Sequence, residues 1–325
     1  MILALDGGST KTLAVVVDER SLQLKGVGLS GSANYTTDSP KQARIEMENA
    51  IKGALKMSHT KLSEINRRIF AIAGIGDSSE ATNQGRSIVN DLVGDNFELM
   101  NDGVSAYYLG NLNYDGVVFA PGTGSVGYVK KGGNMRRIGG WGWTIGDFSS
   151  ATWIVKKGIE IAMFEEDSGE KDRLISKKLN AFFGCNLREL VWKIETKTIP
   201  KNKLASFAPE LAKLAREGYT PAFDIFSQSA EYISSLTNKI VNEFREDIEV
   251  SLAGGTMLAG DFYLNLLKKN IAHKFQTFFG YQVVIGALVY ALRKFDSGLR
   301  ENLVKQLDTI LLAVPQKKLQ EYLKF

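Results

Sequence analysis

Cysteine and histidine are scarce in this sequence, and their scarcity excludes several kinds of site. Cys185 is the only cysteine, so the chain has no internal disulfide framework and cannot hold an iron–sulfur cluster on four cysteines of its own. The two histidines, His59 and His273, lie far apart in lysine-rich surroundings. A zinc site or a Ser/His/Asp triad is therefore not expected.

Long apolar runs and a strong excess of one charge are also missing. The longest apolar run, residues 283–292, is about half of the roughly 20 residues that span a bilayer. No basic segment precedes the first apolar run, so we expect no signal peptide, no membrane association and a cytoplasmic location. With 40 Lys and Arg against 36 Asp and Glu and no basic stripe, nucleic acid is not an expected partner.

The order of apolar and polar segments predicts an α/β fold. Residues 1–17 have the pattern strand, turn and strand, and short apolar strands are predicted within 67–77 and 97–102, with helices between them. Residues 115–133 again have the pattern strand, glycine-rich turn and strand. This repetition predicts two similar lobes that present glycine-rich hairpins to a shared cleft, and two unrelated hairpins are the alternative.

The lobe boundaries follow from this repetition. We expect residues 1–114 with about 295–325 to form the N-terminal lobe, which would end in a helix over 303–325. Residues 115–294 would form the C-terminal lobe.

Glycine, small hydroxyl residues and carboxylates gather at five turns that follow apolar strands. Glycines let the backbone approach a phosphate, successive N–H groups bind its oxygens, and a neighbouring carboxylate can hold Mg²⁺ through water. A tight hairpin without a ligand is the alternative for any single turn. Neither a Walker A motif nor the dinucleotide motif G-x-G-x-x-G occurs. The five turns are residues 6–12, 101–102, 122–125, 139–147 and 254–256.

Taken in order, these turns resemble the acetate and sugar kinase/Hsp70/actin superfamily over nearly the whole chain. Within it they are most similar to the N-acetylglucosamine kinases and the BadF/BadG/BcrA/BcrD ATPases. The resemblance implies two ribonuclease-H-like (actin-like ATPase) lobes around a nucleotide cleft. It also implies ATP and Mg²⁺ as cofactors, a small amino sugar such as N-acetylglucosamine as acceptor of the γ-phosphate, and a homodimer as one option. The motifs are LDGGSTKT (5–12), NDGVSA (101–106), FAPGTGSVGY (119–128), GGWGWTIGD (139–147) and LAGGTM (252–257).

The resemblance assigns roles to individual residues. Asp102 would be the catalytic base and Asp6 would hold Mg²⁺ through water, although Asp102 and Asp147 each have helix capping as an alternative. The residues expected to bind the phosphates are Gly7, Gly8, Ser9, Thr10, Lys11, Thr123, Gly124 and Ser125, those expected at the adenosine are Gly254, Gly255 and Thr256, and those expected at the sugar are Asn34, Asp102, Gly140, Trp141 and Asp147.

The sugar segment departs from the relatives' pattern. Phe148 and Ser149 stand where their GDEGS motif has glutamate and glycine, and Thr36 stands where many carry an aromatic residue. Loss of the glutamate suits an anionic acceptor, and because the family that this chain resembles also includes 2-keto-3-deoxygluconate kinases, that sugar acid is the alternative substrate. The hairpin before this segment carries four cations, Lys130, Lys131, Arg136 and Arg137. One of them could reach the carboxylate of such a substrate, and the alternative is that all four lie solvated on the surface.

Two other classes of protein share such lobes. Reductase-activating ATPases hold an iron–sulfur cluster at a dimer interface, but Cys185 supplies only two cysteines per dimer where a four-cysteine cluster needs four. Non-catalytic sugar sensors carry an added DNA-binding segment, and no helix-turn-helix precedes the first hairpin here. A kinase is therefore the expected activity.

Overall fold

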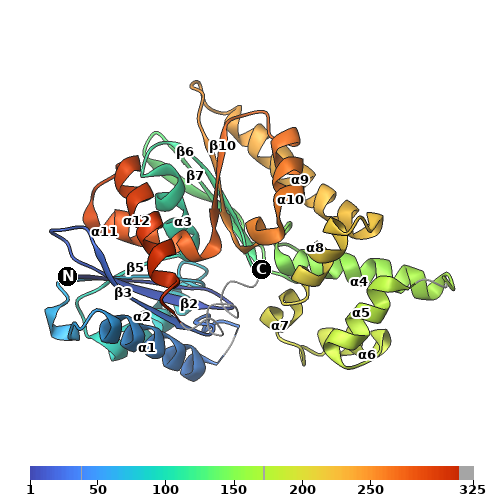
Figure 1. Ribbon diagram of the computed structural model, residues 1–325, viewed down its shortest axis with the longest axis horizontal. Coiled ribbons are helices and arrows are strands. Elements are labelled where there is room, and N and C mark those ends of the chain that lie inside the picture. The colour runs from blue at the N-terminus through green and yellow to red at the C-terminus, as the bar shows by residue number, and fades with distance from the viewer. Residues whose placement is uncertain (38, 171–172, 315–325) are drawn as a thin grey trace.

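Two five-stranded mixed sheets organise the chain (Figure 1). The computed structural model describes residues 1–37, 39–170 and 173–314. The first sheet has the strand order β3-β2-β1-β4-β5 and the second has the order β10-β9-β6-β7-β8. The strands are β1 (Ile2–Gly7), β2 (Thr12–Val17), β3 (Leu24–Ser30), β4 (Arg67–Ile72), β5 (Glu98–Met100), β6 (Gly116–Pro121), β7 (Ser125–Lys131), β8 (Asn134–Gly139), β9 (Val250–Gly254) and β10 (Phe275–Phe279).

The two sheets have the same topology. In each sheet, three consecutive strands form an antiparallel meander. The first strand of the meander also pairs in parallel with a later strand, and that later strand pairs in parallel with the next strand of the chain. The predicted α/β fold with two ribonuclease-H-like lobes is therefore confirmed, and so is the repeat inferred from the two hairpins. Because β1–β2 and β6–β7 are equivalent in the two sheets, their tips occupy equivalent places in the two lobes.

Helix α1 (Pro40–Met57) covers one face of the first sheet. The Ser39 hydroxyl accepts a hydrogen bond from the Gln42 N–H, and Pro40 occupies the first turn, where its missing N–H is not needed. Its buried side chains recur at helical spacing and pack on β2 and β3. Helix α2 (Ser79–Val93) packs beside α1 and is capped in the same way by Ser78.

A set of helices between β8 and β9 enlarges the second lobe, and it extends away from the sheet in Figure 1. Its long members α4 and α9 pack with α8 over a core that includes β6 and β9. The helices are α4 (Ala151–Asp167), α5 (Leu174–Phe183), α6 (Leu187–Glu195), α7 (Lys201–Ala205), α8 (Ala208–Arg216) and α9 (Thr220–Val241), and α10 (Asp261–Asn270) follows β9.

Helices α3 (Asp102–Asn111) and α11 (Val283–Leu292) lie between the two sheets (Figure 1). Helix α11 packs on β1 and β4, and α3 packs on α11, β6 and β9, so one hydrophobic cluster contains side chains of both sheets. Ser105 donates a hydrogen bond of 2.6 Å to the Val283 carbonyl oxygen. The two lobes therefore share part of their core.

The chain's end returns to the first sheet. Helix α12 (Ser297–Leu311) packs on β3 and α11. The helix predicted over 303–325 thus begins six residues earlier than expected, and residues 315–325 lie outside the described residues. The lobe boundary expected near residue 294 stays a prediction, and the packing of α11 against β1 argues for moving it ahead of that helix.

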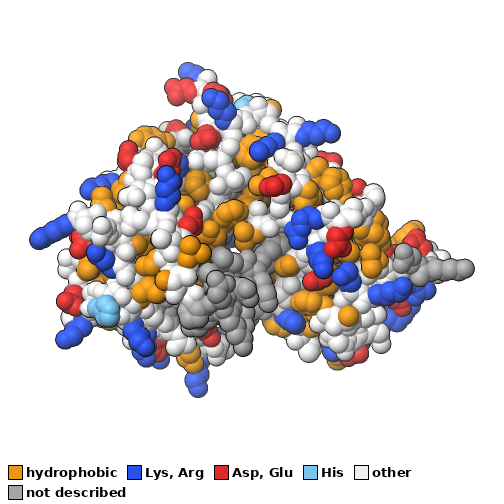
Figure 2. All heavy atoms as spheres, in the orientation of Figure 1, with side chains coloured by type: hydrophobic (Ala, Val, Ile, Leu, Met, Phe, Trp, Pro, Cys, Tyr) orange, Lys and Arg blue, Asp and Glu red, His pale blue; other side chains and the backbone are white. Residues whose placement is uncertain are grey.

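The surface carries a mixture of charges. On the face in Figure 2, blue and red side chains are interspersed over both halves of the molecule. Within the described ranges, no helix has both the length and the apolar character needed to cross a membrane.

The contact between α3 and α11 gives the first testable prediction. A Cβ added at Gly286 would overlap the Ser105 carbonyl oxygen, and backbone cannot move aside as a side chain can. We expect Gly286→Ala to destabilise the protein by about 3 kcal/mol, the upper part of the range for overpacking a core. Thermal unfolding of the variant beside the wild type measures this loss.

Gly298→Ala is the matched control. This helical glycine faces only the Asp296 side chain, which would lie 3.3 Å from an added Cβ, so alanine should change stability by no more than about 0.5 kcal/mol. Equal stability of the Gly286 and Gly298 variants would contradict the close packing of α3 on α11.

Candidate active site

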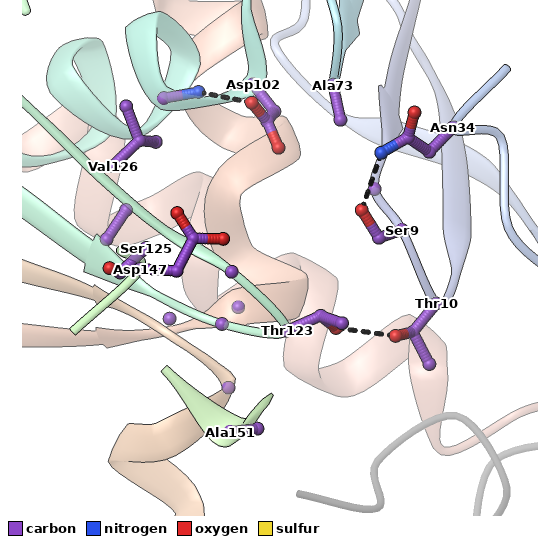
Figure 3. Close-up of a pocket in the computed structure, with 18 of the residues that line it drawn as sticks. Ser9, Thr10, Asn34, Ala73, Asp102, Thr123, Ser125, Val126, Asp147 and Ala151 are labelled. Carbon is purple, nitrogen blue, oxygen red and sulfur yellow. Dashed lines mark hydrogen bonds between the residues drawn. The ribbon is translucent and has the colours of Figure 1, made fainter. Parts of the chain in front are cut away.

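A cavity of about 430 Å³ opens between the two lobes. All five turns singled out in the sequence contribute to its wall, which confirms that they converge in space. Figure 3 shows the side chains of Asn34, Asp102 and Asp147 around this space and the contact between Thr10 and Thr123 at its edge. The predicted residues that line it are Asp6, Gly8, Ser9, Thr10, Lys11, Asn34, Asp102, Thr123, Gly124, Ser125, Gly140, Asp147, Gly254, Gly255 and Thr256.

Gly7 and Trp141 are the two predicted residues that do not line the cavity. Gly7 lies within β1, where a Cβ would come within 2.9 Å of the Ala33 Cβ, so its lack of a side chain serves close packing instead. Trp141 is 77% exposed, and Trp143 contributes to the wall in its place. The sequence identified this aromatic loop but selected the wrong tryptophan for the wall.

The two hairpin tips meet across the cleft. The Gly8 N–H donates to the Lys11 carbonyl oxygen (3.0 Å), and the Gly122 N–H donates to the Gly124 carbonyl oxygen (2.7 Å), so both tips are tight turns. The Thr10 and Thr123 hydroxyl oxygens are 2.6 Å apart. The hydroxyls and the open backbone of both lobes therefore face one space.

The glycines of these turns fit a phosphate-bearing ligand. A Cβ at Gly122 would have its nearest neighbour 3.9 Å away, and one at Gly255 would meet nothing within 4 Å. The space in front of Gly122 and Gly255 is thus open to a ligand, whereas the ends of the Lys201 and Asp147 side chains lie in front of Gly124. Lys11 also lines the cavity, and burial lowers the pKa of its ammonium to about 8.

Asp102 is the first residue of α3 and lies at the cavity wall. The N-cap is Asn101, whose side-chain oxygen accepts from the Gly103 N–H at 3.0 Å, so the capping alternative for Asp102 is wrong. Burial raises the pKa of the Asp102 carboxyl to about 6, against the opposing hydrogen bond from the Gly103 N–H. Asp77 raises this pKa further, and the positive charges of Arg137 and Lys201 lower it.

Asp6 lies at the cavity end of β1. Burial raises the pKa of its carboxyl well above the usual range, and the nearby charge of Asp102 raises it further. Among the residues described, no three His, Cys, Asp or Glu side chains form a metal cage. Mg²⁺ typically binds through one or two carboxylates, water and substrate phosphates, so Asp6 fits the metal role predicted for it.

Asn34 is held on the first-lobe side of the cavity. It is 6% exposed, and its Nδ2 donates to the Ser9 hydroxyl at 2.7 Å. Its Oδ1 accepts from the Thr36 N–H and hydroxyl at 3.0 and 2.6 Å. Thr36 thus orients the Asn34 amide.

Asp147 is held on the second-lobe side. It is 5% exposed and has φ of +50°, a left-handed conformation that few non-glycine residues adopt. Its Oδ1 accepts from the Gly142 N–H at 3.2 Å, and its Oδ2 pairs with Lys201 Nζ at 2.8 Å. Ser150 is the N-cap of α4, so the capping alternative for Asp147 is wrong.

Phe148 of the GDFSS segment does not contribute to the cavity wall. Phe148 is not among the lining residues and stacks on Tyr232 with ring centroids 4.8 Å apart. The side chain that the sequence associated with a changed acceptor pocket therefore points into a packing contact.

The cations of the preceding hairpin divide into two groups. Lys130 donates to Asn113, and Arg136 pairs with Glu243 at 2.9 Å on the surface. Arg137 instead lines the cavity and pairs with Asp77 of the first lobe at 2.5 Å.

Lys201 and Asp77 were not identified from the sequence. Lys201 begins the short helix α7. Asp77 follows β4 in a glycine-rich loop. Neither residue belongs to a recognisable sequence motif. The sequence offered only a charged residue in a glycine-rich loop or near the start of a short helix.

Comparisons with known proteins agree with this architecture. A candidate N-acetylglucosamine kinase from Porphyromonas gingivalis superposes with a TM-score of 0.73, at 18% identity over 91% of this chain and 100% of that one. A glucokinase of the ROK family from Streptomyces griseus, solved with glucose and AMPPNP, gives a TM-score of 0.58, at 16% identity over 90% and 99% of the two chains. These likenesses define the fold class, the two-lobed sugar kinase and actin-like ATPase fold.

The sequence itself places the chain in a family. The model of the BadF/BadG/BcrA/BcrD ATPase family matches residues 3–291, so the chain belongs to that family. The N-acetyl-D-glucosamine kinase of Dictyostelium discoideum is 25% identical over 293 residues, which cover 85% of this chain and 91% of that protein.

The lowered pKa of Lys11 gives a second prediction. Lysine is charged below its pKa, so the Lys11 ammonium is charged at pH 7 and neutral above about pH 8. If it binds phosphate, the affinity for ADP should fall by about 10-fold between pH 7 and pH 9. Calorimetric titration with ADP at several pH values measures this change.

Two variants make this test specific. Lys11→Met should bind ADP more weakly than the wild type at pH 7, and its affinity should no longer depend on pH. The surface variant Lys25→Met should keep the wild-type affinity and its pH dependence. Identical pH profiles for the wild type and Lys11→Met would contradict a phosphate contact by Lys11.

Proposed function

We propose that the protein is an ATP-dependent carbohydrate kinase that transfers the γ-phosphate to a hydroxyl of a small sugar, of the N-acetylglucosamine or amino-sugar type. The observation that carries this proposal is the position of Asp102. Its carboxylate lies in the same cavity as two hairpin tips suited to phosphate and as Asn34 and Asp147, two polar groups suited to sugar hydroxyls. The kinase names of the relatives support the same activity.

The chemistry assigns one task to each part of the cavity. Asp102 accepts the proton of the sugar hydroxyl, the hydroxyl oxygen forms a bond to the γ-phosphorus, and the bond from that phosphorus to the β-phosphate oxygen breaks to release ADP. Thr10 and Thr123 hold the phosphates through their hydroxyls and Gly124 through its backbone N–H, while Gly8, whose own N–H bonds the Lys11 carbonyl oxygen, lets the phosphates approach the first tip. Mg²⁺, held near Asp6 through water, would neutralise charge on the phosphates.

A sugar acid such as 2-keto-3-deoxygluconate is the second candidate acceptor. Arg137 and Lys201 line the cavity and can offer positive charge to a carboxylate. Each is already paired with a carboxylate of the protein, Asp77 and Asp147 respectively, so neither cation requires an anionic acceptor to balance its charge. This balance favours a neutral or amino sugar.

The other two classes have less support in the structure. Cys185, which an activating ATPase would need at a cluster, packs against the helical core of the second lobe and does not line the cavity. A sensor needs no base, whereas Asp102 is exposed to the cavity with a pKa suited to accepting a proton. A cytoplasmic location and a homodimer stay predictions, and the lone cysteine fits a reducing compartment.

An assay of ADP release tests the proposed function. The protein with Mg-ATP is offered N-acetylglucosamine, glucosamine, glucose, N-acetylmannosamine, gluconate and 2-keto-3-deoxygluconate in turn. We expect turnover with an amino or N-acetylamino sugar. Turnover with the keto-deoxy acid alone would select the second candidate, and no acceptor-dependent turnover would refute a sugar kinase of this type.

The role of Asp102 gives a prediction of its own. A base must be ionised, and the Asp102 carboxyl is ionised above about pH 6 and protonated below it. The value of kcat/KM should therefore fall about tenfold per pH unit below pH 6. Asp102→Asn should lower kcat by about 100-fold or more, the range for loss of a general base, while the sugar still binds.

Asp91→Asn on the exposed face of α2 is the control for the loss of one carboxylate. It should retain the activity and pH profile of the wild type. Near-normal turnover by Asp102→Asn would remove Asp102 from the role of base.

A further inference from the structure

Lys201 lies where the phosphate side of the cavity meets the acceptor side. It begins α7 in the second lobe, and only 12% of its side chain is exposed. Its Nζ is 2.8 Å from Asp147 Oδ2, the carboxylate placed at the acceptor. A long, charged side chain held this far from solvent needs a partner or a function, because desolvation penalises its charge.

The same ammonium also lies over the tip of the β6–β7 hairpin. A Cβ at Gly124 would stand 2.5 Å from Lys201 Nζ and 2.6 Å from Asp147 Oδ2. Only the absence of a side chain at residue 124 leaves room for this ion pair above the loop. The ammonium is thus adjacent to the backbone that faces the phosphates and to the acceptor residue.

The charge of Lys201 also reaches Asp102. Its field lowers the pKa of the Asp102 carboxyl, as does that of Arg137. Lys201 is therefore adjacent to the phosphate hairpin and to the acceptor carboxylate, and its charge also acts on Asp102. In the proposed reaction the γ-phosphoryl group moves from the hairpin side of the cavity to the acceptor side.

We propose that the Lys201 ammonium contacts the γ-phosphoryl group of ATP and stabilises its charge during transfer, with Asp147 holding the ammonium in place beforehand. This proposal rests on the proposed kinase function. The sugar oxygen forms its bond to the γ-phosphorus as the bond to the ADP oxygen breaks, and Asp102 takes the hydroxyl proton. Lys201 donates hydrogen bonds to oxygens of the moving group and transfers no proton itself.

A merely structural role makes a different prediction. If Lys201 only neutralises the buried Asp147, its loss would affect folding and acceptor binding, and replacing Asp147 by asparagine would compensate. A γ-phosphoryl contact would instead distinguish nucleotides that carry this group from those that lack it. Binding of AMPPNP and ADP separates the two roles without any turnover.

The experiment measures the affinity of Mg-AMPPNP and of Mg-ADP by calorimetry for Lys201→Met and wild type. We expect Lys201→Met to lose affinity for AMPPNP by about 10- to 100-fold, the range of one charge-assisted hydrogen bond, and affinity for ADP by less than about threefold. Lys201→Arg should recover most of the AMPPNP affinity. Equal losses for both nucleotides, or no loss, would overturn the proposal.

Two further variants serve as controls. Lys201→Met with Asp147→Asn removes both charges of the pair, so it keeps the neutral balance and avoids a buried unpaired carboxylate. The selective loss of AMPPNP affinity should persist in this double variant, and its disappearance would assign Lys201 to neutralising Asp147 alone. Lys203→Met is the control on the same helix, because its ammonium lies 4.6 Å from the centre of the Phe182 ring and does not line the cavity.

Turnover then tests the catalytic part. With an acceptor identified, Lys201→Met should lower kcat by about 100- to 1,000-fold, with a smaller change in KM for the sugar. A wild type that turns over no sugar would refute the proposed kinase, whereas the comparison of AMPPNP with ADP would still decide whether Lys201 contacts the γ-phosphoryl group.

Discussion

The packing of α3 against α11 is the constraint on which the site depends. The two helices approach so closely that Gly286 has no room for a side chain beside the Ser105 carbonyl oxygen. Asp102 begins α3, and Val283 at the start of α11 lines the same cavity. Because both helices contact both sheets or their connections, the contact between them fixes Asp102, the proposed base, relative to the two hairpins.

The charges of the cavity divide into two kinds. Asp77 and Asp147 each pair with a cation, Arg137 and Lys201, and these pairs neutralise the walls of the cleft. Among the described residues Asp6 and Asp102 form no such ion pair, and burial raises the pKa of both. Carboxylates left unpaired in this way are suited to exchanging a proton or attracting a cation, as the roles proposed for Asp102 and Asp6 require.

The sequence predicted much of this architecture because strand-and-turn patterns are local. The repeated hairpins revealed two lobes, and the order of glycine-rich turns indicated which segments meet in the cleft. Trp141 was misassigned because alternation along a loop does not determine which of two nearby tryptophans turns inward. Lys201 was missed because its position depends on how α7 packs on α4, a contact between distant segments that leaves no periodic signal.

The proposed kinase depends on the hairpin tips of the two lobes forming one phosphate site, in which the Thr10 and Thr123 hydroxyl oxygens lie 2.6 Å apart. The most direct test is calorimetric titration of Mg-AMPPNP into Thr10→Val, Thr123→Val and the double variant. A shared site predicts that each single variant binds about three- to tenfold more weakly, and that the double variant loses less than the product of the two effects. Unchanged affinity in both single variants would contradict it.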